Sequence, residues 1–431
     1  TNPHNQTIRA RRAFELPTAT RQARLSITAD SFYRLYVNGE WVGDGPGRSW
    51  PEHFQYDVLD VAPYLYAGRN EIEVIARYFG VGTFHQVSQR PGLLVQLDVT
   101  PVKGRSVRVI SDETWDVAEA NAWRRWTPKV SCQMEPWELY DARLEAPLRF
   151  SKAAVVCAAD KGPWRDLHAG DSRPLTRVPM PAQRLHSALV VAKPEVGPTF
   201  LQAQMLHPGL IEANYSACMS HALATVVISK TARKVRYDFP VYLVTVNGQA
   251  GKDNVFSLKA GRNLLLACYH EVFPLEKDRP FRFMERDGLV YENPLGKHAA
   301  TPWCYVPSMA PLYVGNDMIY VTHLDPARKR AEDECRAAMR ALIEASVDEA
   351  SFLRAAGKRA KPVAPEHLLT EDAAHELITR RPIADAAPLV EAPDALMYDN
   401  AACTVVSPSA DGDIELIYDL GVQTVATTPS T

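Results

Sequence analysis

The alternation of apolar and polar residues along residues 20–320 constrains the fold more than any other feature of this sequence. Residues 70–78, NEIEVIARY, have apolar side chains at positions 72, 74, 76 and 78 and charged ones at 71, 73 and 77. Because successive side chains of a strand point to opposite faces of a sheet, this pattern predicts a strand with one face in a core. Residues 235–239 and 414–420 repeat it.

Short turn sequences separate these predicted strands. Asn-Gly, Asp-Gly and Pro-Gly pairs supply the positive φ angles that tight reversals require. They lie at residues 38–39, 247–248, 287–288 and 91–92. Many short strands separated by such turns favour antiparallel sandwiches or jelly rolls over a parallel sheet. The predicted fold class is therefore mainly β.

An internal repeat divides this region into two related copies. The sequence LYVNG at residues 35–39 precedes GRNEIEV at 68–74, and VTVNG at 244–248 precedes GRNLLLA at 261–267. Each copy predicts a strand, an Asn-Gly hairpin turn, a loop and a strand that opens with a Gly-x-Asn turn. Two similar sandwiches in tandem are the simplest interpretation.

The pattern changes to helical after residue 324. Asp325 and Pro326 predict a helix start, and residues 327–345 are rich in Ala, Arg and Glu with an apolar stripe. Residues 346–349 fit a capping box for a second short helix that ends near Gly357. The predicted domains are a first sandwich at 1–185, a second at 186–324, a helical insertion at 325–380, a linker at 381–394 and the truncated start of a further β module at 395–431.

Length and composition limit the possible functions. A chain of 431 residues is too long for one core, and its net charge of -3 disfavours a nucleic-acid partner. No run of about 18 apolar residues is present, so no membrane span is expected. The amino end has no signal-peptide pattern, and the seven cysteines form no C-x-x-C pair. We therefore expect a cytoplasmic protein without a metal or other cofactor.

Several segments resemble family 78 glycoside hydrolases, the α-L-rhamnosidases. The sequence ELYDAR at residues 138–143 is similar to the E-x-Y-D-A-R element that closes the N-terminal β-sandwich in that family. Galactose-binding-like sandwiches of β-galactosidases and β-glucuronidases share the V-N-G hairpin, but the Y-D-A-R element favours family 78. The similar segments lie at residues 33–46, 56–58, 68–70, 90–94, 138–143, 395–400 and 413–421.

The resemblance implies tandem galactose-binding-like jelly-roll sandwiches and a downstream (α/α)6 barrel that holds the catalytic carboxylates. No catalytic residue of the family matches a position in this chain, so the chain alone is expected to be inactive. The implied function is an accessory region that supports the barrel and binds a rhamnose-containing glycan. The alternatives are a free-standing carbohydrate-binding protein and the N-terminal part of a rhamnose-glucuronate polysaccharide lyase, which has a similar architecture.

The loops that follow the second strand of each repeat copy are candidate carbohydrate sites. Sugar recognition needs an aromatic face and groups that bind hydroxyls, and loops at one end of a sandwich commonly supply them. Aromatic residues beside a strand are also common core residues, and that alternative stays open. The predicted carbohydrate-binding residues are Tyr78, Phe84, His85, Gln86, His270 and Glu271.

A second group of candidate residues lies beside the Y-D-A-R element. Carboxylates next to tryptophans are able to bind sugar or to act as acid and base. The favoured interpretation is structural, with the tryptophans packed in the sandwich and Asp141 paired with Arg143 or a neighbouring domain. This group comprises Trp123, Trp126, Trp137, Glu135, Glu138 and Asp141. The sequence has no zinc, nucleophile-elbow or phosphate-loop motif.

Overall fold

The computed structural model of the chain describes most residues between His4 and Val422. They are residues 4–47, 49, 53–80, 82–83, 87, 89–125, 127, 134–159, 161–162, 164–171, 180–192, 199–200, 217–237, 243–272, 288–307, 309–311, 313–314, 326–369, 382–398 and 400–422. The chain divides into two compact units, residues 1–172 with 197–373 and residues 173–196 with 374–431.

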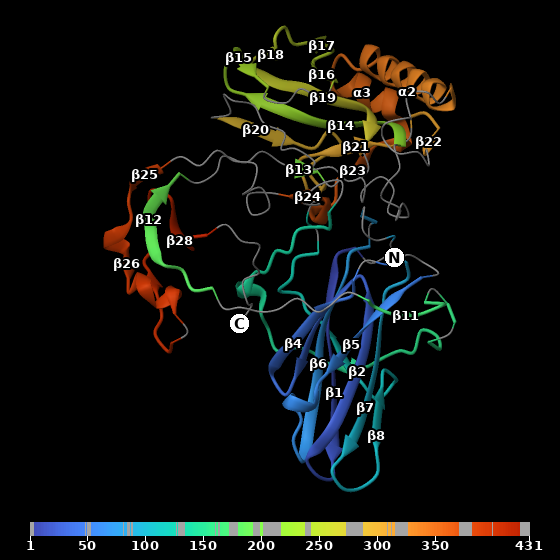
Figure 1. Cartoon of the computed structure of the whole chain (residues 1–431). Coiled ribbons are helices and arrows are strands. Elements are labelled where there is room, and N and C mark those ends of the chain that lie inside the picture. Colours follow the sequence, from blue (N-terminus) through green and yellow to red (C-terminus); the bar gives the residue numbers. More distant parts are fainter. Residues whose placement is uncertain are drawn as a thin grey trace. The chain divides into compact units, whose positions relative to one another are not determined.

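The described part is mainly β, with several antiparallel sheets and a short helical segment (Figure 1). This confirms the coarse fold class that the alternation predicts. The assignment of the sandwiches as galactose-binding-like jelly rolls stays a prediction.

Two sheets with a shared core form the first sandwich, which runs from blue to green in Figure 1. The strand orders are β10-β9-β1-β6-β3-β4 and β11-β5-β2-β7-β8. The bounds are β1 Gln6–Leu16, β2 Thr20–Asp30, β3 Phe32–Val37, β4 Glu40–Gly45, β5 Gln55–Asp60, β6 Gly68–Tyr78, β7 Gly92–Pro101, β8 Val107–Ile110, β9 Asp116–Glu119, β10 Ser151–Lys152 and β11 His168–Ala169.

Burial along β3 confirms the predicted period of two. Tyr33, Leu35 and Val37 are 0% exposed and lie in the core between the sheets. Arg34 and Tyr36, between them, are half-buried and lie on the other face of the six-stranded sheet. We call this second face, opposite the core, the outer face.

A larger sheet and two helices form the second module, which lies within residues 199–369. Its strands are β13 Thr199–Phe200, β14 Ala217–Ser229, β15 Arg233–Arg236, β16 Leu243–Val246, β17 Gln249–Ala250, β18 Val255–Leu258, β19 Gly261–Val272, β20 Leu289–Glu292, β21 Cys304–Val306, β22 Tyr313–Val314, β23 Lys361–Pro362 and β24 Leu368–Leu369. The long strands β14 and β19 pair antiparallel at the centre of the sheet. Leu265 and Ala267 on one face of β19 join a core with Val235 and Phe256 of the small β15-β18 sheet.

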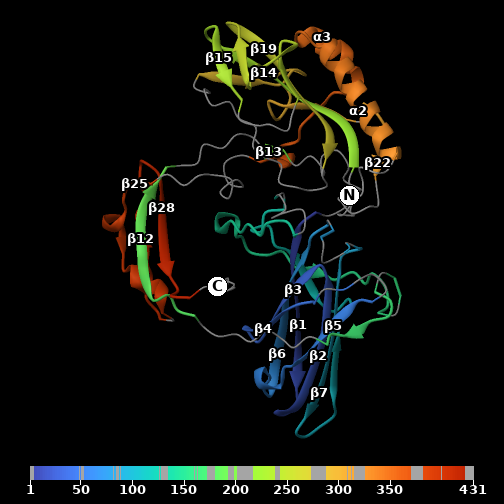
Figure 2. The same cartoon turned by 45° about the horizontal axis from the view of Figure 1, so that its top comes forward.

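The predicted helical insertion packs on the opposite face of that sheet. Helix α2 is Pro326–Glu344 and helix α3 is Glu349–Ala356, and Figure 2 shows both along one side of the strands. Their buried side chains contact Leu264 and Leu266 of β19 in one apolar cluster. Within the described residues, α-helix is confined to these two segments.

The capping box of α3 differs from the predicted one by two residues. Asp348, not Ser346, caps the helix: its Oδ1 accepts a hydrogen bond from the Ser351 amide (2.7 Å), and Ser351 Oγ accepts one from the Asp348 amide (2.9 Å). A capping box needs two side chains, each of which accepts a hydrogen bond from the backbone amide of the other residue. Asp348 and Ser351 can both do so, and the box therefore forms between them. Gly357, at φ 55°, ends the helix as predicted.

The internal repeat corresponds to the same hydrogen-bonded clamp in both copies. In the first sandwich, Asn38 Nδ2 donates to Asn70 Oδ1 (2.9 Å), and Asn38 Oδ1 accepts from the Glu71 amide (2.8 Å). In the second module, Asn247 Nδ2 donates to Asn263 Oδ1 (2.9 Å), and Asn247 Oδ1 accepts from the next amide, that of Leu264 (3.0 Å). The hairpin turn is therefore tied to the return strand in the same way twice.

A third module combines residues from both sides of the second. Strand β12 Arg184–Val191 pairs antiparallel with β28 Asp413–Asp419 and with β25 Pro382–Asp385. A short pair, β26 Val390–Glu391 with β27 Val405–Val406, accompanies them. The predicted boundary at 185/186 thus falls inside β12, and the predicted linker contains β25 and β26. Proline is tolerated on an edge strand such as β25, which is why a proline-rich segment resembled a linker.

Neither described helix is long and apolar enough to cross a membrane. Five cysteines of the described part are free thiols, of which Cys268, Cys304 and Cys335 are buried. Cys157 is half-buried and Cys403 is exposed.

Candidate functional site

Residues 134–149, here called the closing segment, pass over the outer face of the first sandwich. Their anchor is Arg77 of β6, which is 8% exposed. Its Nη2 donates to the carbonyl oxygens of Pro136 (2.6 Å) and Trp137 (2.8 Å), and its Nε donates to Asn5 Oδ1 (2.8 Å). Charge-assisted bonds of this kind are stronger than neutral ones, so the buried guanidinium holds the segment on the sheet.

The Y-D-A-R element forms the next part of the closing segment. Asp141 caps the short 3-10 helix Ala142–Leu144 and binds Arg143 through two hydrogen bonds of 2.8 Å. Arg124 lies 3.3 Å from the same carboxylate. The hydrogen bonds from Arg143 lower the pKa of Asp141 to about 2. The predicted pairing of Asp141 with Arg143 is confirmed, and this carboxylate is a structural anion.

The predicted tryptophan and glutamate group is also held by structural contacts. Glu138 accepts a hydrogen bond from Trp123 Nε1 (3.1 Å) and lies 3.9 Å from Arg77. Trp137 contributes its carbonyl oxygen to the Arg77 anchor. Trp126 lies outside the described residues. These contacts agree with the structural interpretation rather than with an acid and base pair.

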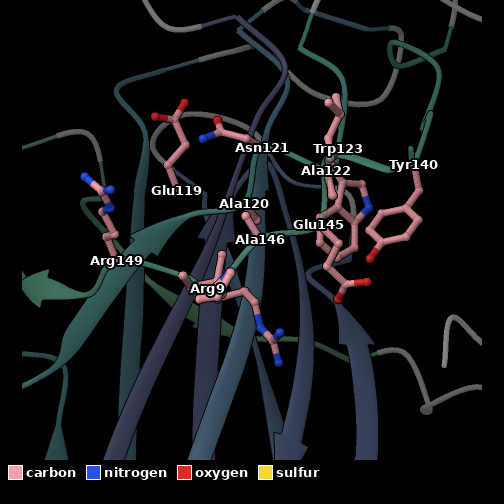
Figure 3. A pocket seen from close by; sticks show the side chains of 13 residues that line it. Arg9, Glu119, Ala120, Asn121, Ala122, Trp123, Tyr140, Glu145, Ala146 and Arg149 are labelled. Carbon is pink, nitrogen blue, oxygen red and sulfur yellow. The ribbon is translucent and has the colours of Figure 1, made fainter. Parts of the chain in front are cut away.

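A pocket of about 640 Å³ opens beside this group (Figure 3). One wall is the turn after β9, and the other is the 3-10 helix with the chain that follows it. Arg9 of β1 lies between them. The lining residues are Arg9, Glu119, Ala120, Asn121, Ala122, Trp123, Tyr140, Leu144, Glu145, Ala146, Pro147, Leu148 and Arg149. Its volume is within the range of known small-molecule sites.

Two aromatic rings form one side of this pocket. Trp123 and Tyr140 pair across an isolated antiparallel bridge, and their ring centroids lie 4.7 Å apart in an edge-to-face arrangement of 66°. The Trp123 ring is fixed through Glu138, while 42% of Tyr140 is exposed. Desolvation, and then a hydrogen bond to the Glu145 carboxylate, raise the pKa of Tyr140. The phenol therefore stays neutral and polar at one end of the aromatic surface.

The charged lining of the pocket is balanced. Arg9 and Arg149 oppose Glu119 and Glu145, so neither sign predominates. Arg9 is held by Glu73 of β6, to which its Nε donates (2.6 Å), and Glu119 accepts from Gln6 Nε2 (3.1 Å). A neutral ligand with many hydroxyl groups fits such a surface better than a polyanion does.

Arg9, Glu119 and Arg149 belong to no sequence motif that marks a binding site. Arg9 and Glu119 lie more than 20 residues from Tyr140 in the chain, whereas Arg149 follows it in the closing segment. Only the fold of that segment brings the three charged residues to one pocket. Arg9 stands at an outward position of β1, where a charged residue is ordinary, so its sequence context gives no signal of a site.

Among the residues predicted to bind carbohydrate, Tyr78 has a described side chain. It is 5% exposed, and its hydroxyl donates to the Gln89 carbonyl oxygen (2.7 Å). Phe84, His85 and Gln86 lie outside the described residues. His270 and Glu271 belong to strand β19, and their side chains lie outside the described part. This predicted site stays a prediction.

The side chain of Gln89, near Tyr78, carries a buried hydrogen-bond donor. Gln89 donates its amide hydrogen to the Asp30 carboxylate (2.8 Å), but its buried side-chain Nε2 has no hydrogen-bond partner within the described residues. A buried donor without a partner costs about 1 to 3 kcal/mol, so an acceptor in this position would be stabilising.

No group of three or more His, Cys, Asp or Glu side chains in the described ranges is placed to hold a metal ion.

Comparison with known proteins shows which family part of the chain resembles. Residues 18–169 match the family model described as the α-L-rhamnosidase N-terminal domain. An α-L-rhamnosidase of Streptomyces avermitilis is 35% identical over 146 residues, which are 31% of this chain and 14% of that protein. One from Formosa agariphila is 31% identical over 151 residues, which are 32% of this chain and 15% of that protein. The matches thus span about one seventh of each relative's length.

A solved structure resembles almost the whole chain. The crystal structure of a GH78 family rhamnosidase of Bacillus sp. GL1 superposes with a TM-score of 0.74 and 25% sequence identity, over 97% of this chain and 45% of that one. Residues 18–169 thus match the α-L-rhamnosidase N-terminal domain, and the chain is related to the N-terminal β-domains of family 78 α-L-rhamnosidases.

Proposed function

We propose that this chain is an accessory β-domain region of an α-L-rhamnosidase-like glycoside hydrolase, which supports a catalytic domain and binds carbohydrate. The relatives named above are rhamnosidases, and the described carboxylates beside the pocket are engaged in structural contacts. A purified sample of the chain is expected to release no rhamnose from an aryl rhamnoside. Turnover that co-purifies with the folded chain would overturn the accessory role.

The pocket of the closing segment is the proposed carbohydrate site, and the observation that supports it most is the composition of its lining. The exposed Tyr140 ring supplies an apolar face for a sugar ring, as aromatic side chains do in binding sites. Arg9, Arg149, Asn121 and the two glutamates supply donors and acceptors for hydroxyl groups. The proposed ligand is a neutral sugar of a rhamnose-containing glycan.

The test is calorimetric titration of the chain with L-rhamnose. We expect the wild type to bind and Tyr140→Ala to lose at least about tenfold in affinity, or about 1.4 kcal/mol. Tyr398→Ala is the matched control, because Tyr398 is 61% exposed and lies in the third module. Equal affinity of Tyr140→Ala and wild type, with unchanged thermal midpoints, would remove the pocket from the proposal.

A second carbohydrate site beside Tyr78 is supported by the side-chain Nε2 of Gln89, which has no hydrogen-bond partner within the described residues. The residues proposed for it are Tyr78, Phe84, His85 and Gln86, and the counterpart loop of the second copy is proposed to bind through His270 and Glu271. The double variant Phe84→Ala with His85→Ala is expected to weaken glycan binding without unfolding the chain. Unchanged affinity in that variant would exclude the first loop as a site.

A further inference from the structure

The outer face of the six-stranded sheet continues from the pocket as a row of aligned side chains. In the strand register, Trp41 of β4 lies opposite Tyr36 of β3, and Tyr36 lies opposite Glu73 of β6. A parallel row holds Asp44, Arg34, Ile75 and Arg9, which belong to β4, β3, β6 and β1. Directly opposed residues share a face, so both rows lie on the side away from the core.

The aromatic end of this face is held in a fixed arrangement. Trp41 Nε1 donates to Asp44 Oδ1 (2.8 Å), and Arg34 Nε binds the same oxygen (3.3 Å). The Arg34 guanidinium also lies 5.8 Å from the centre of the Trp41 ring. Tyr36 and Trp41 are half-buried, so each retains exposed ring surface. An aromatic pair that is already ordered loses little entropy when a ligand stacks on it.

The link between this aromatic pair and the pocket is one ion pair. Glu73, directly opposite Tyr36, binds Arg9, and Arg9 lines the pocket. Three strand steps separate Trp41 from Arg9, which corresponds to about 14 Å at a spacing of about 4.8 Å per strand. The surface is therefore longer than a single sugar ring.

We infer that Tyr36 and Trp41 form a second subsite, so that the first sandwich binds an extended neutral oligosaccharide whose one end occupies the pocket. This rests on the proposed carbohydrate binding in the pocket. The charges along the face alternate as Asp44, Arg34, Glu73 and Arg9, which suits hydroxyl groups and opposes a polyanion. The continuity with the pocket favours a glycan over a protein partner.

The test compares ligands of increasing length in the same titration. Wild type is expected to bind longer rhamno-oligosaccharides at least about tenfold more tightly than L-rhamnose. Trp41→Ala is expected to abolish this gain and to leave L-rhamnose affinity unchanged, and Trp41→Phe to retain part of it. Tyr398→Ala serves as the exposed-aromatic control.

The outcomes separate the two proposals. If the chain binds L-rhamnose but shows no gain with length, or keeps the gain in both Trp41 variants, the second subsite is excluded and the pocket stands. If no ligand binds, the proposed carbohydrate binding itself fails. If Trp41→Ala unfolds the chain, Trp41→Phe and Tyr36→Ala decide, and full retention of the gain in both excludes the subsite. A change of sedimentation coefficient in the Trp41 variants without loss of the gain would mark a protein interface and also exclude it.

Discussion

The first sandwich and the second module share a hairpin clamp but cover their sheets differently. After the Gly-x-Asn turn, β6 reads EIEV and β19 reads LLLA. Along residues 70–76 of β6 burial alternates, whereas in β19 every residue from Asn263 to Cys268 is buried. Helices α2 and α3 cover the face of β19 that corresponds to the outer face of β6. A continuous apolar run thus marks a strand with both faces covered, and alternation marks a strand with one.

This difference explains why the candidate site lies in the first copy. A Cβ atom added to Gly248 in the second hairpin would lie 3.0 Å from Val347, which belongs to the connection between α2 and α3. A Cβ atom added to the equivalent Gly39 would meet no atom within 4 Å. Glu73 and Leu266 are equivalent positions relative to the clamp, and one binds Arg9 while the other packs under a helix. The outer face stays available to a ligand only where no helices cover it.

The largest change in stability is expected when the residues at these equivalent positions are exchanged. Leu266→Glu places a charge in an apolar cluster without a counter-ion, so we expect a loss of about 5 kcal/mol or unfolding of the module. Glu73→Leu is the reciprocal control and is expected to change stability by less than about 1 kcal/mol. Urea denaturation measures both. Similar losses in the two variants would contradict the distinction between covered and open faces.

The clamp itself is expected to contribute equally to both copies. Asn70→Ala would remove its hydrogen bonds with Tyr66, Gly68 and the hairpin asparagine, and Asn263→Ala the equivalent bonds with Lys259, Gly261 and its hairpin asparagine. With four or more hydrogen bonds lost at about 1 kcal/mol each, each variant should lose about 4 kcal/mol. Denaturation of each single variant gives the two values. A loss of stability in one copy alone would show that the two clamps share their geometry but not their contribution to the free energy of unfolding.

Buried acid groups separate the two copies in their pH response. Asp30, 3% exposed in the first sandwich, has its pKa raised by burial to about 6, and no Asp or Glu is buried in the described second module. The folded state therefore holds a proton that the unfolded chain releases, and stability falls by up to about 3 kcal/mol as pH rises from about 4 to 7. Asp30→Asn should lack this decline.

The measurement for Asp30 is the difference in unfolding free energy between wild type and Asp30→Asn across that pH range. The lost acceptor atom gives a constant offset, since Ser31 and the Gln89 amide each bind one carboxylate oxygen. Only the slope reports the titration. A difference that does not change with pH would show that Asp30 titrates normally.

Local patterns in the sequence predicted the parts of the fold that depend on nearby residues. Alternation identified β6, Asn-Gly pairs identified both hairpins, and Pro326 marked the start of α2. Residue chemistry also favoured a structural role for Asp141. The capping of α3 was misplaced because two overlapping candidates differ only in which side chain can reciprocate.

Non-local pairings were beyond these patterns. Nothing in residues 184–191 indicates that they pair with residues 413–419. The proline-containing segment 381–394 resembles a linker, although its residues 382–385 form an edge strand. The pocket joins Arg9 to Tyr140 through the Arg77 anchor, whose partners are carbonyl oxygens that carry no sequence signal. The difference between EIEV and LLLA is visible in the sequence, and it is the clearest indication of which sheet has an uncovered face.

The pairing of β12 with β28 also fixes an order of events on the ribosome. Asp413 follows its partner Val191 by 222 positions, so at about 5 to 20 residues per second β12 waits about 10 to 45 s for that partner to be synthesised. The whole second module emerges during this interval and is free to fold first. Until β28 arrives, β12 presents an unpaired hydrogen-bonding edge, and we expect nascent chains to depend on a chaperone in that window.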